Sequence, residues 1–192
     1  MAALNTDQFA AINTGAIKNL QAVQFAALTT DQIVALTTAQ VRALGSTQLT
    51  ALVSDQVAAL ETVDLAALST AQVTVLGTDQ LQALLTDQLA SLATAQLTAL
   101  TTDQIAAGLN TDQIAALTTE QAASLATKQV AALTTAQIVA LETADLSSFT
   151  TRQIVALTSD QIGVLNSDQL NGMTTTELAA LTTSQILSLI HI

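Results

Sequence analysis

The sequence predicts an all-α solenoid made of very short helices. Three observations lead to this prediction: an eight-residue unit recurs from end to end, its apolar positions have helical spacing, and a 24-residue period lies over it. A typical unit covers residues 29–36 and reads TTDQIVAL. Its closing apolar residue recurs every eighth position over residues 4–100 and, after the inserted Gly108, over residues 109–189. A short fixed period is typical of solenoids, in which each unit contacts only its neighbours.

Each octad is expected to form one helix of about two turns, too short to be stable without neighbours. When the octad is numbered to its closing Leu, position 4 is usually Gln, position 5 a large aliphatic residue or Phe, and position 7 small. Positions 5 and 8 are three apart, so Ile33 and Leu36 share one helical face. We expect the N-cap at position 2, as at Thr30, with an acidic residue next in the first turn. The alternative is an N-cap at position 1, which makes Thr29 and Gln32 a capping box.

Two other folds were weighed against the short helices. In one continuous helix, the apolar stripe would rotate by about 80° per octad, so no partner helix could follow it. A three-sided β-solenoid is the main alternative, because Thr, Ile and Val favour strands. A straight strand would, however, place positions 5 and 8 on opposite faces, which favours the helical fold.

The 24-residue period predicts that three octads form one coil and that about eight coils stack. Residues one coil apart are then vertical neighbours. Thr or Ser at position 2 and Gln at position 4 are expected to be semi-buried at the corners, where they bond exposed backbone groups. No linker divides the chain, so we expect a single domain, residues 1–192, with Gly108 as a one-residue bulge at a corner. The period is clearest at position 3, where these acids recur: Asp7, Asp31, Asp55, Asp79 and Asp103.

Composition argues against several classes of function. The net charge is −11 with only four Lys and Arg residues, so a phosphate backbone and an anionic membrane surface would both be repelled. Without Cys there is no disulfide and no thiolate metal site. Mean hydropathy is +0.50, yet polar residues interrupt every apolar run before the roughly 20 residues that a membrane helix needs. The first residues, MAALNTD, show no signal peptide.

No catalytic, cofactor-binding or metal-binding residues are predicted, so we do not expect an enzyme. The Asp column is the only candidate ion site, but its members would lie on the order of 10 Å apart, which is too far to share one cation. After Gly108 the same column reads Lys128, Arg152 and Thr176. We therefore interpret the column as helix-start acids on a solvated face.

Two segments of the chain are near-copies of each other, and each contains a pair of acids. Residues 61–65 read ETVDL and residues 142–146 read ETADL. They could form a weak metal or partner patch, and duplication of a unit is the favoured explanation. His191 is the sole His, so neither a catalytic triad nor a zinc site can be built from it. No Gly-rich phosphate loop is present.

The octad resembles two families. The pattern L-[ST]-x-x-Q-[IVL]-x-A-L, as in residues 133–141 (LTTAQIVAL), is similar to repeat tracts of very large secreted bacterial proteins of the RTX adhesin and haemagglutinin type. That resemblance implies a stalk or spacer and a secreted or cell-surface location. No Gly-Gly-x-Gly-x-Asp nonapeptide occurs, so it does not imply calcium binding. The octad also resembles the first helix of TAL-effector repeats, but the second helix and the base-reading loop are missing.

The expected function is that of a structural repeat protein, either a spacer or stalk or a self-assembling solenoid. The last residues, 186–192, are apolar (ILSLIHI), so open ends could stack head to tail into fibres. The expected partner is therefore a second copy or another protein. The alternative is a binding module that presents one solenoid face to a protein or glycan.

Overall fold

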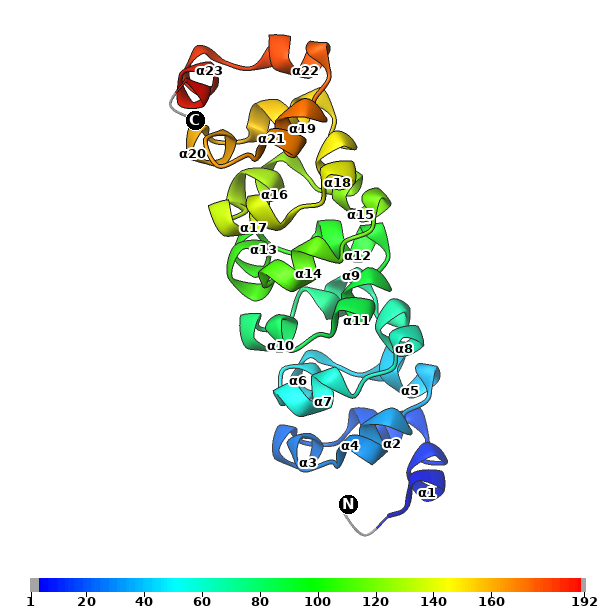
Figure 1. The fold of residues 1–192 in the computed structure, drawn as a ribbon. Coiled ribbons are helices and arrows are strands. Elements are labelled where there is room, and N and C mark those ends of the chain that lie inside the picture. Colours follow the sequence, from blue (N-terminus) through cyan, green and yellow to red (C-terminus); the bar gives the residue numbers. More distant parts are fainter. Residues whose placement is uncertain (1–3, 191–192) are drawn as a thin grey trace. The chain divides into compact units, whose positions relative to one another are not determined.

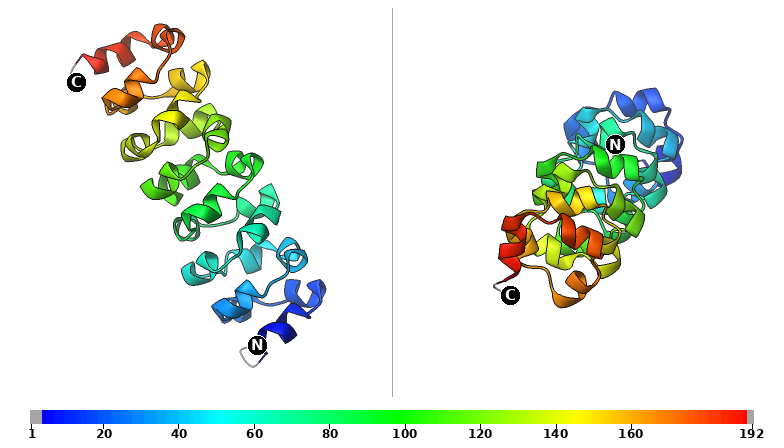
Figure 2. Two further views of the ribbon diagram at one scale, coloured as in Figure 1. Left: turned by 45° about the vertical axis from the view of Figure 1, so that its right-hand side comes forward. Right: turned by 90° about the horizontal axis from the view of Figure 1, so that it is seen from above.

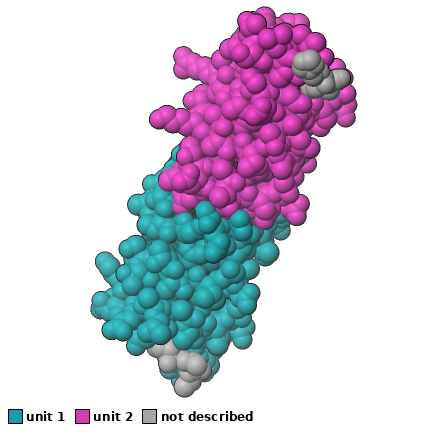
Figure 3. Space-filling view, turned by 90° about the vertical axis from the view of Figure 1, so that its left-hand side faces the viewer, with its two compact units in different colours: residues 1–100 teal, residues 101–192 magenta. Residues whose placement is uncertain are grey.

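A computed structural model describes residues 4–190 (Figure 1). These residues form short α-helices and, within that range, no β-strand. Contacts divide the chain into two compact units, residues 1–100 and 101–192, which Figure 3 separates by colour. The predicted all-α fold with one short helix per octad is confirmed, and the β-solenoid alternative is wrong.

Unit 1 contains the first twelve described helices. In order they are α1 (Thr6–Ala10), α2 (Thr14–Lys18), α3 (Ala22–Ala26), α4 (Thr30–Val34), α5 (Thr38–Ala43), α6 (Ser46–Leu49), α7 (Ser54–Ala58), α8 (Thr62–Ala67), α9 (Thr70–Val73), α10 (Thr78–Gln82), α11 (Thr86–Ala90) and α12 (Thr94–Ala99).

Unit 2 contains the remaining eleven described helices. They are α13 (Thr102–Gly108), α14 (Thr111–Ala115), α15 (Thr119–Ser124), α16 (Thr127–Ala132), α17 (Thr135–Ala140), α18 (Thr143–Ser147), α19 (Thr151–Ala156), α20 (Ser159–Ile162), α21 (Ser167–Asn171), α22 (Thr175–Ala180) and α23 (Thr183–Leu189).

In each unit, the extensive helix contacts join helices that are three apart in order. In unit 1, α1 packs on α4, α2 on α5, α3 on α6 and α5 on α8; α3 and α6 lie one above the other in Figure 1. In unit 2, α13 packs on α16, α14 on α17, α16 on α19 and α20 on α23. The alternation of short helices and corners is visible from two further directions in Figure 2. The predicted coil of three octads is therefore confirmed within each unit.

The N-cap of each helix lies one residue earlier in the octad than we expected. Thr29, at position 1, is the N-cap of α4 and has extended backbone angles, and the helix itself starts at Thr30. The expected cap at position 2 is therefore wrong, and the capping-box alternative is correct. The Thr29 hydroxyl accepts a bond from the Gln32 backbone N–H (3.2 Å), and Gln32 Oε1 accepts one from the Thr29 N–H (3.2 Å). Both otherwise unpaired amides are satisfied in this way.

The core is built from positions 5 and 8 of the octad, as predicted. Ile33 is fully buried and Leu36 nearly so, and the same holds for the corresponding pairs through most of both units. Burying side chains of this size stabilises a fold by about 1.5–3 kcal/mol each, which offsets the weakness of the isolated helices. Position 2 differs from the prediction: residues such as Thr30 and Thr62 are exposed, because they occupy the first helical turn.

The inserted residue Gly108 does not form a corner bulge. It is the last residue of α13, which spans seven residues where most helices have four to six, and it is buried. The extra residue is thus absorbed by lengthening one helix, and Leu109 follows in an extended conformation as the next closing apolar residue.

Candidate functional site

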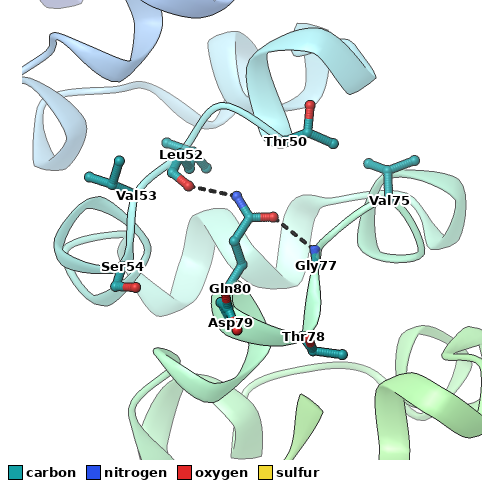
Figure 4. A pocket seen from close by; sticks show the side chains of 9 residues that line it. All are labelled: Thr50, Leu52, Val53, Ser54, Val75, Gly77, Thr78, Asp79 and Gln80. Atoms are coloured by element: carbon teal, nitrogen blue, oxygen red, sulfur yellow. Dashed lines mark hydrogen bonds between the residues drawn. The ribbon is translucent and has the colours of Figure 1, made fainter. Parts of the chain in front are cut away.

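The most specific chemistry in the fold is a Gln side chain that spans two coils at most corners. In unit 1, Gln80 lies at the third position of α10 and points back toward the corner of the coil before it (Figure 4). Its Nε2 donates to the carbonyls of Leu49 (2.8 Å) and Leu52 (2.7 Å), and its Oε1 accepts from the Gly77 backbone N–H (2.9 Å). One side chain therefore satisfies an N-terminal amide of its own helix and C-terminal carbonyls of an earlier helix.

We call this arrangement the Gln bridge. Its Nε2 reaches the closing residue 28 positions earlier, because the corner before each helix lies on the corner of the preceding coil. The predicted role of Gln, bonding backbone between segments, is confirmed. Within the two units the bridge to the preceding coil is made by Gln32, Gln40, Gln48, Gln56, Gln72, Gln80, Gln88, Gln96, Gln137, Gln153, Gln161, Gln169 and Gln185.

The bridge explains why position 1 tolerates so many residue types. Gly45 has no side chain with which to cap α6, and Val53 makes no side-chain cap bond to α7. In both helices the Gln still accepts a bond from the N-cap amide, at 3.0 Å from Gly45 N to Gln48 and at 3.0 Å from Val53 N to Gln56. The half of the capping box that recurs from octad to octad is thus the Gln bond, and the bond from the N-cap side chain is present only in some octads.

Three corners carry an acid in place of the bridging Gln. Glu177 in α22 keeps the bond from its N-cap amide, at 2.7 Å from Thr174 N, whereas the two Asp residues do not. Asp64 in α8 and Asp145 in α18 are 1% and 2% exposed, so they are not available to a metal or partner patch on the surface. Neither helix has a capping box, and their N-caps Glu61 and Glu142 make no side-chain cap bond. The structure does not bring the four acids into a metal site; among residues 4–190, no three His, Cys, Asp or Glu side chains gather closely enough to hold a metal ion.

The environment of these acids changes their protonation. Burial raises the pKa of Asp64 above its ordinary value of 3.8; the nearby Glu61 charge raises it further, and a hydrogen bond from Thr38 partly opposes the shift. Burial likewise raises the pKa of Asp145, with a smaller contribution from the Glu142 charge and an opposing bond from Thr119. Burial favours the neutral form of a carboxyl, so desolvation is the leading cause in both places.

The four basic residues form two stacked pairs, one in each unit. Lys18 and Arg42 lie on packed helices α2 and α5 and line a shallow groove of about 560 Å³ beside Gly45. In unit 2, Arg152 of α19 lines a groove of about 430 Å³, and Lys128 belongs to α16, which packs on α19. The groove in Figure 4, about 490 Å³, is instead bordered by Asp79 and the Gln80 bridge.

The first coil of unit 1 exposes one half of a coil-to-coil interface. Its position 5 residue Phe9 is completely buried, whereas the closing residues Ile12 and Leu20 are only half-buried. Gln8 and Gln24 accept a bond at Oε1 from their N-cap amides, but among the described residues their Nε2 groups reach no corner carbonyl. This face therefore presents closing apolar residues and unused amide donors.

The last coil of unit 2 exposes the opposite half. The position 5 residues Leu178 and Ile186 are 38% and 40% exposed, although this position is fully buried in inner coils. The closing residue Leu181 remains buried at 9% exposure. Within the described residues, the corner carbonyls of Leu165 and Leu181 receive no Gln amide. This face therefore presents apolar position 5 side chains and unused acceptors.

The acids of the predicted Asp column lie on the surface, as expected. Asp7, Asp31 and Asp79 lie exposed in the first turns of their helices, where the helix dipole favours an acid. His191 lies outside the described residues. No described helix has the length and apolar character needed to cross a bilayer.

This geometry defines a class of protein: a helical repeat protein in which three short helices form one coil and Gln bridges join successive coils within each unit. The model of the ALTTAQ repeat matches five stretches of the chain, residues 1–38, 34–62, 57–94, 86–119 and 138–175. Because these stretches cover well over half of the sequence, the chain belongs to the ALTTAQ repeat family. Curated proteins yield no match to the chain.

The sequence did not predict that Asp64 and Asp145 are buried, or that one end face exposes position 8 residues and the other exposes position 5 residues. Asp64 and Asp145 look like ordinary first-turn acids until the octad is aligned, when each falls on position 4. That alignment was the available signal, since position 4 is the one polar position that both units bury. Nothing in the sequence distinguishes a residue that faces the next coil from one that faces the previous coil.

Proposed function

We propose that this structural repeat protein acts by self-assembly, with the end face of one copy docking on the opposite end face of a second copy. One observation carries the proposal: the two exposed end faces are the complementary halves of an interface that the chain already repeats internally. One end offers Gln8 and Gln24 amides, and the other offers corner carbonyls such as that of Leu165. A heterologous contact of this kind extends into a filament unless its rotation closes a ring.

The apolar side chains support the same pairing. The half-buried Ile12 and Leu20 would cover the exposed Leu178 and Ile186, as positions 8 and 5 cover each other in inner coils. Burying apolar surface contributes roughly 25 cal/mol per Å², so covering these side chains would favour the end-to-end contact and oppose the free-energy cost of bringing two copies together. This role is structural and not enzymatic, and the resemblance to repeat tracts of secreted bacterial proteins is consistent with a stalk or spacer.

The test is the oligomeric state of the 192-residue chain over a wide concentration range, measured by analytical ultracentrifugation. We expect species that grow with concentration. Ile186→Asp should abolish this growth by placing a charge on the end face. Val63→Asp is the matched control, because Val63 is 57% exposed on α8 within unit 1 and not on an end face. A chain that stays monomeric at every concentration contradicts the proposal.

A second candidate function is a binding module that recognises an acidic protein segment. The specific observation that favours it is that the four basic residues lie in pairs on packed helices, and that Lys18, Arg42 and Arg152 line grooves, in a chain of net charge −11. A labelled Glu-rich peptide should bind in a salt-sensitive way, and Lys18→Ala with Arg42→Ala should remove binding to the unit 1 groove. Unchanged peptide anisotropy with the wild-type chain at low salt would exclude this candidate.

A further inference from the structure

Asp64 and Asp145 differ from every bridging Gln in having a buried oxygen with no partner. Asp64 Oδ1 and Asp145 Oδ2 are inaccessible to solvent, and neither has a hydrogen bond in the structure. An ionised carboxylate in this position leaves a charged acceptor unsatisfied and out of water, which is strongly unfavourable. The neutral acid removes the charge and turns one oxygen into a donor.

In unit 1, the groups around Asp64 do not supply a compensating cation at the buried oxygen. Its own helix carries the N-cap Glu61, and a bond from Thr38 of α5 reaches the carboxyl. The two helices packed against α8 are α5, which carries Arg42 in its last turn, and α11, which carries Asp87. Of these charged groups, it is the negative charge of Glu61 that affects the Asp64 carboxyl, and it favours the neutral form by raising its pKa.

In unit 2, the surroundings of Asp145 repeat this pattern. The Thr119 hydroxyl of α15 donates to Asp145 Oδ1 at 2.9 Å, which leaves Oδ2 as the unpartnered atom. The helices packed against α18 are α15 and α21, and both carry acids, Glu120 and Asp168. The N-cap of α18 is again an acid, Glu142.

We propose that Asp64 and Asp145 are buried as neutral carboxylic acids whose acid proton replaces the amide hydrogen of the bridging Gln, which gives each unit one pH-sensitive corner. By the 28-residue register of the Gln bridge, the acceptors that we assign to the two acid protons are the carbonyls of Leu36 and Leu117. These carbonyls are the acceptors that a Gln at the same position would use. The acid is shorter than Gln by one methylene and makes no bond to its N-cap amide, so the corner depends on this proton.

The direction of the pH effect follows from the raised pKa of both groups. A carboxyl whose pKa is higher in the folded than in the unfolded chain stabilises the fold fully below its ordinary pKa of 3.8. That contribution is lost as the pH rises through the folded-state value. Each unit should therefore loosen at one defined corner, the start of α8 or of α18, as the solution becomes less acidic.

The experiment compares the urea midpoint of the wild-type chain with that of Asp64→Asn combined with Asp145→Asn, from below the ordinary aspartate pKa up to neutral pH. Asn has the same shape, stays neutral and keeps an N–H donor. We expect the wild-type midpoint to fall relative to this variant as the pH rises. Asp55→Asn combined with Asp160→Asn is the matched control, since it removes the same charge from exposed first-turn positions, one in each unit. Parallel pH curves for the wild type and the Asp64 and Asp145 variant would overturn the proposal.

Two further measurements keep the test decisive if the variant does not fold. Carbon-13 NMR titration of the wild-type side chains should show both carboxyls protonating above the ordinary value of 3.8, and titration at or below it overturns the proposal. Addition of calcium chloride at neutral pH tests the ionised alternative. A calcium-dependent rise in the wild-type midpoint that the variant lacks would mean cation-bound carboxylates, and would also overturn it.

Discussion

Inner coils and end coils contain the same octad, but they differ in which positions they bury. Ile154 in α19 is completely buried, whereas Ile186 at the same octad position in α23 is 40% exposed. At the other end, Phe9 is completely buried although Ile12 is only half-buried. Position 5 is therefore covered by the following coil, and position 8 by the preceding one. The two faces of a coil are therefore different, and each interface joins the position 5 face of one coil to the position 8 face of the next.

The largest expected difference between the two regions is at position 5. Ile154→Ala should destabilise unit 2 by about 2–5 kcal/mol, because it leaves a cavity between two packed coils. Ile186→Ala should cost less than about half of that, since its side chain is partly in water already. Urea unfolding followed by circular dichroism measures both at a concentration where the chain is monomeric. Equal losses would mean that position 5 is not covered by the following coil.

The Gln bridge gives the second test of the same comparison. Gln161 accepts from Thr158 N (2.7 Å) and donates to Leu133 O (2.6 Å), whereas Gln24 accepts only from Gln21 N (3.0 Å) among the described residues. Gln161→Ala leaves buried groups unpaired and should cost about 1–3 kcal/mol, and Gln24→Ala about 0.5–1 kcal/mol. Gln161→Glu distinguishes the bond to the N-cap amide from the bond to the preceding coil, because Glu keeps the acceptor oxygen and removes the N–H donor. If Gln161→Glu had the same free energy of unfolding as the wild type at neutral pH, the bond to the preceding coil would contribute nothing to stability.

The smallest expected effect is at the N-cap, where inner and end coils should not differ. Asn13 caps α2 in the first coil and Asn110 caps α14 in unit 2, each accepting a backbone N–H at 2.9 Å. Since this bond lies within one octad, Asn13→Ala and Asn110→Ala should each cost about 0.5–2 kcal/mol. Thermal unfolding of both variants measures this. A much larger loss for Asn110→Ala would show that the cap also takes part in contacts between coils.

The sequence predicted the parts of the fold that depend on periodicity. The spacing of Ile33 and Leu36 indicates one helical face, and the 24-residue recurrence of Asp7 and Asp31 indicates three octads per coil. The N-cap was placed one residue late, because the Gln bridge makes position 1 tolerant of Gly45 and similar residues. Gly108 was placed in a corner, because a sequence cannot show that a helix will lengthen to absorb an insertion.

The candidate sites were harder to predict than the fold. The octad position of Asp31 correctly predicted an exposed first-turn acid, but the same reasoning missed the burial of Asp64. The difference lies in one octad position: position 3 faces solvent and position 4 lies under the preceding corner. Only the three-dimensional register, in which a side chain meets carbonyls 28 residues earlier, reveals that an acid at position 4 has no counter-charge.

The corners between octads have a consequence for how such proteins can change in length. In residues 4–190, no residue adopts a positive φ, so no corner needs a Gly, and Pro is absent from the sequence. Most corners are formed instead by an extended N-cap and a Gln whose side chain hydrogen-bonds to carbonyls of the preceding coil. Adding or removing 24 residues would leave every remaining Gln bridge in register, whereas a change of 8 would shift each helix to a different side of the coil. Tandem duplication and loss of whole coils should therefore be tolerated, and the sequence between them is free to drift wherever Gln and the two apolar positions are kept.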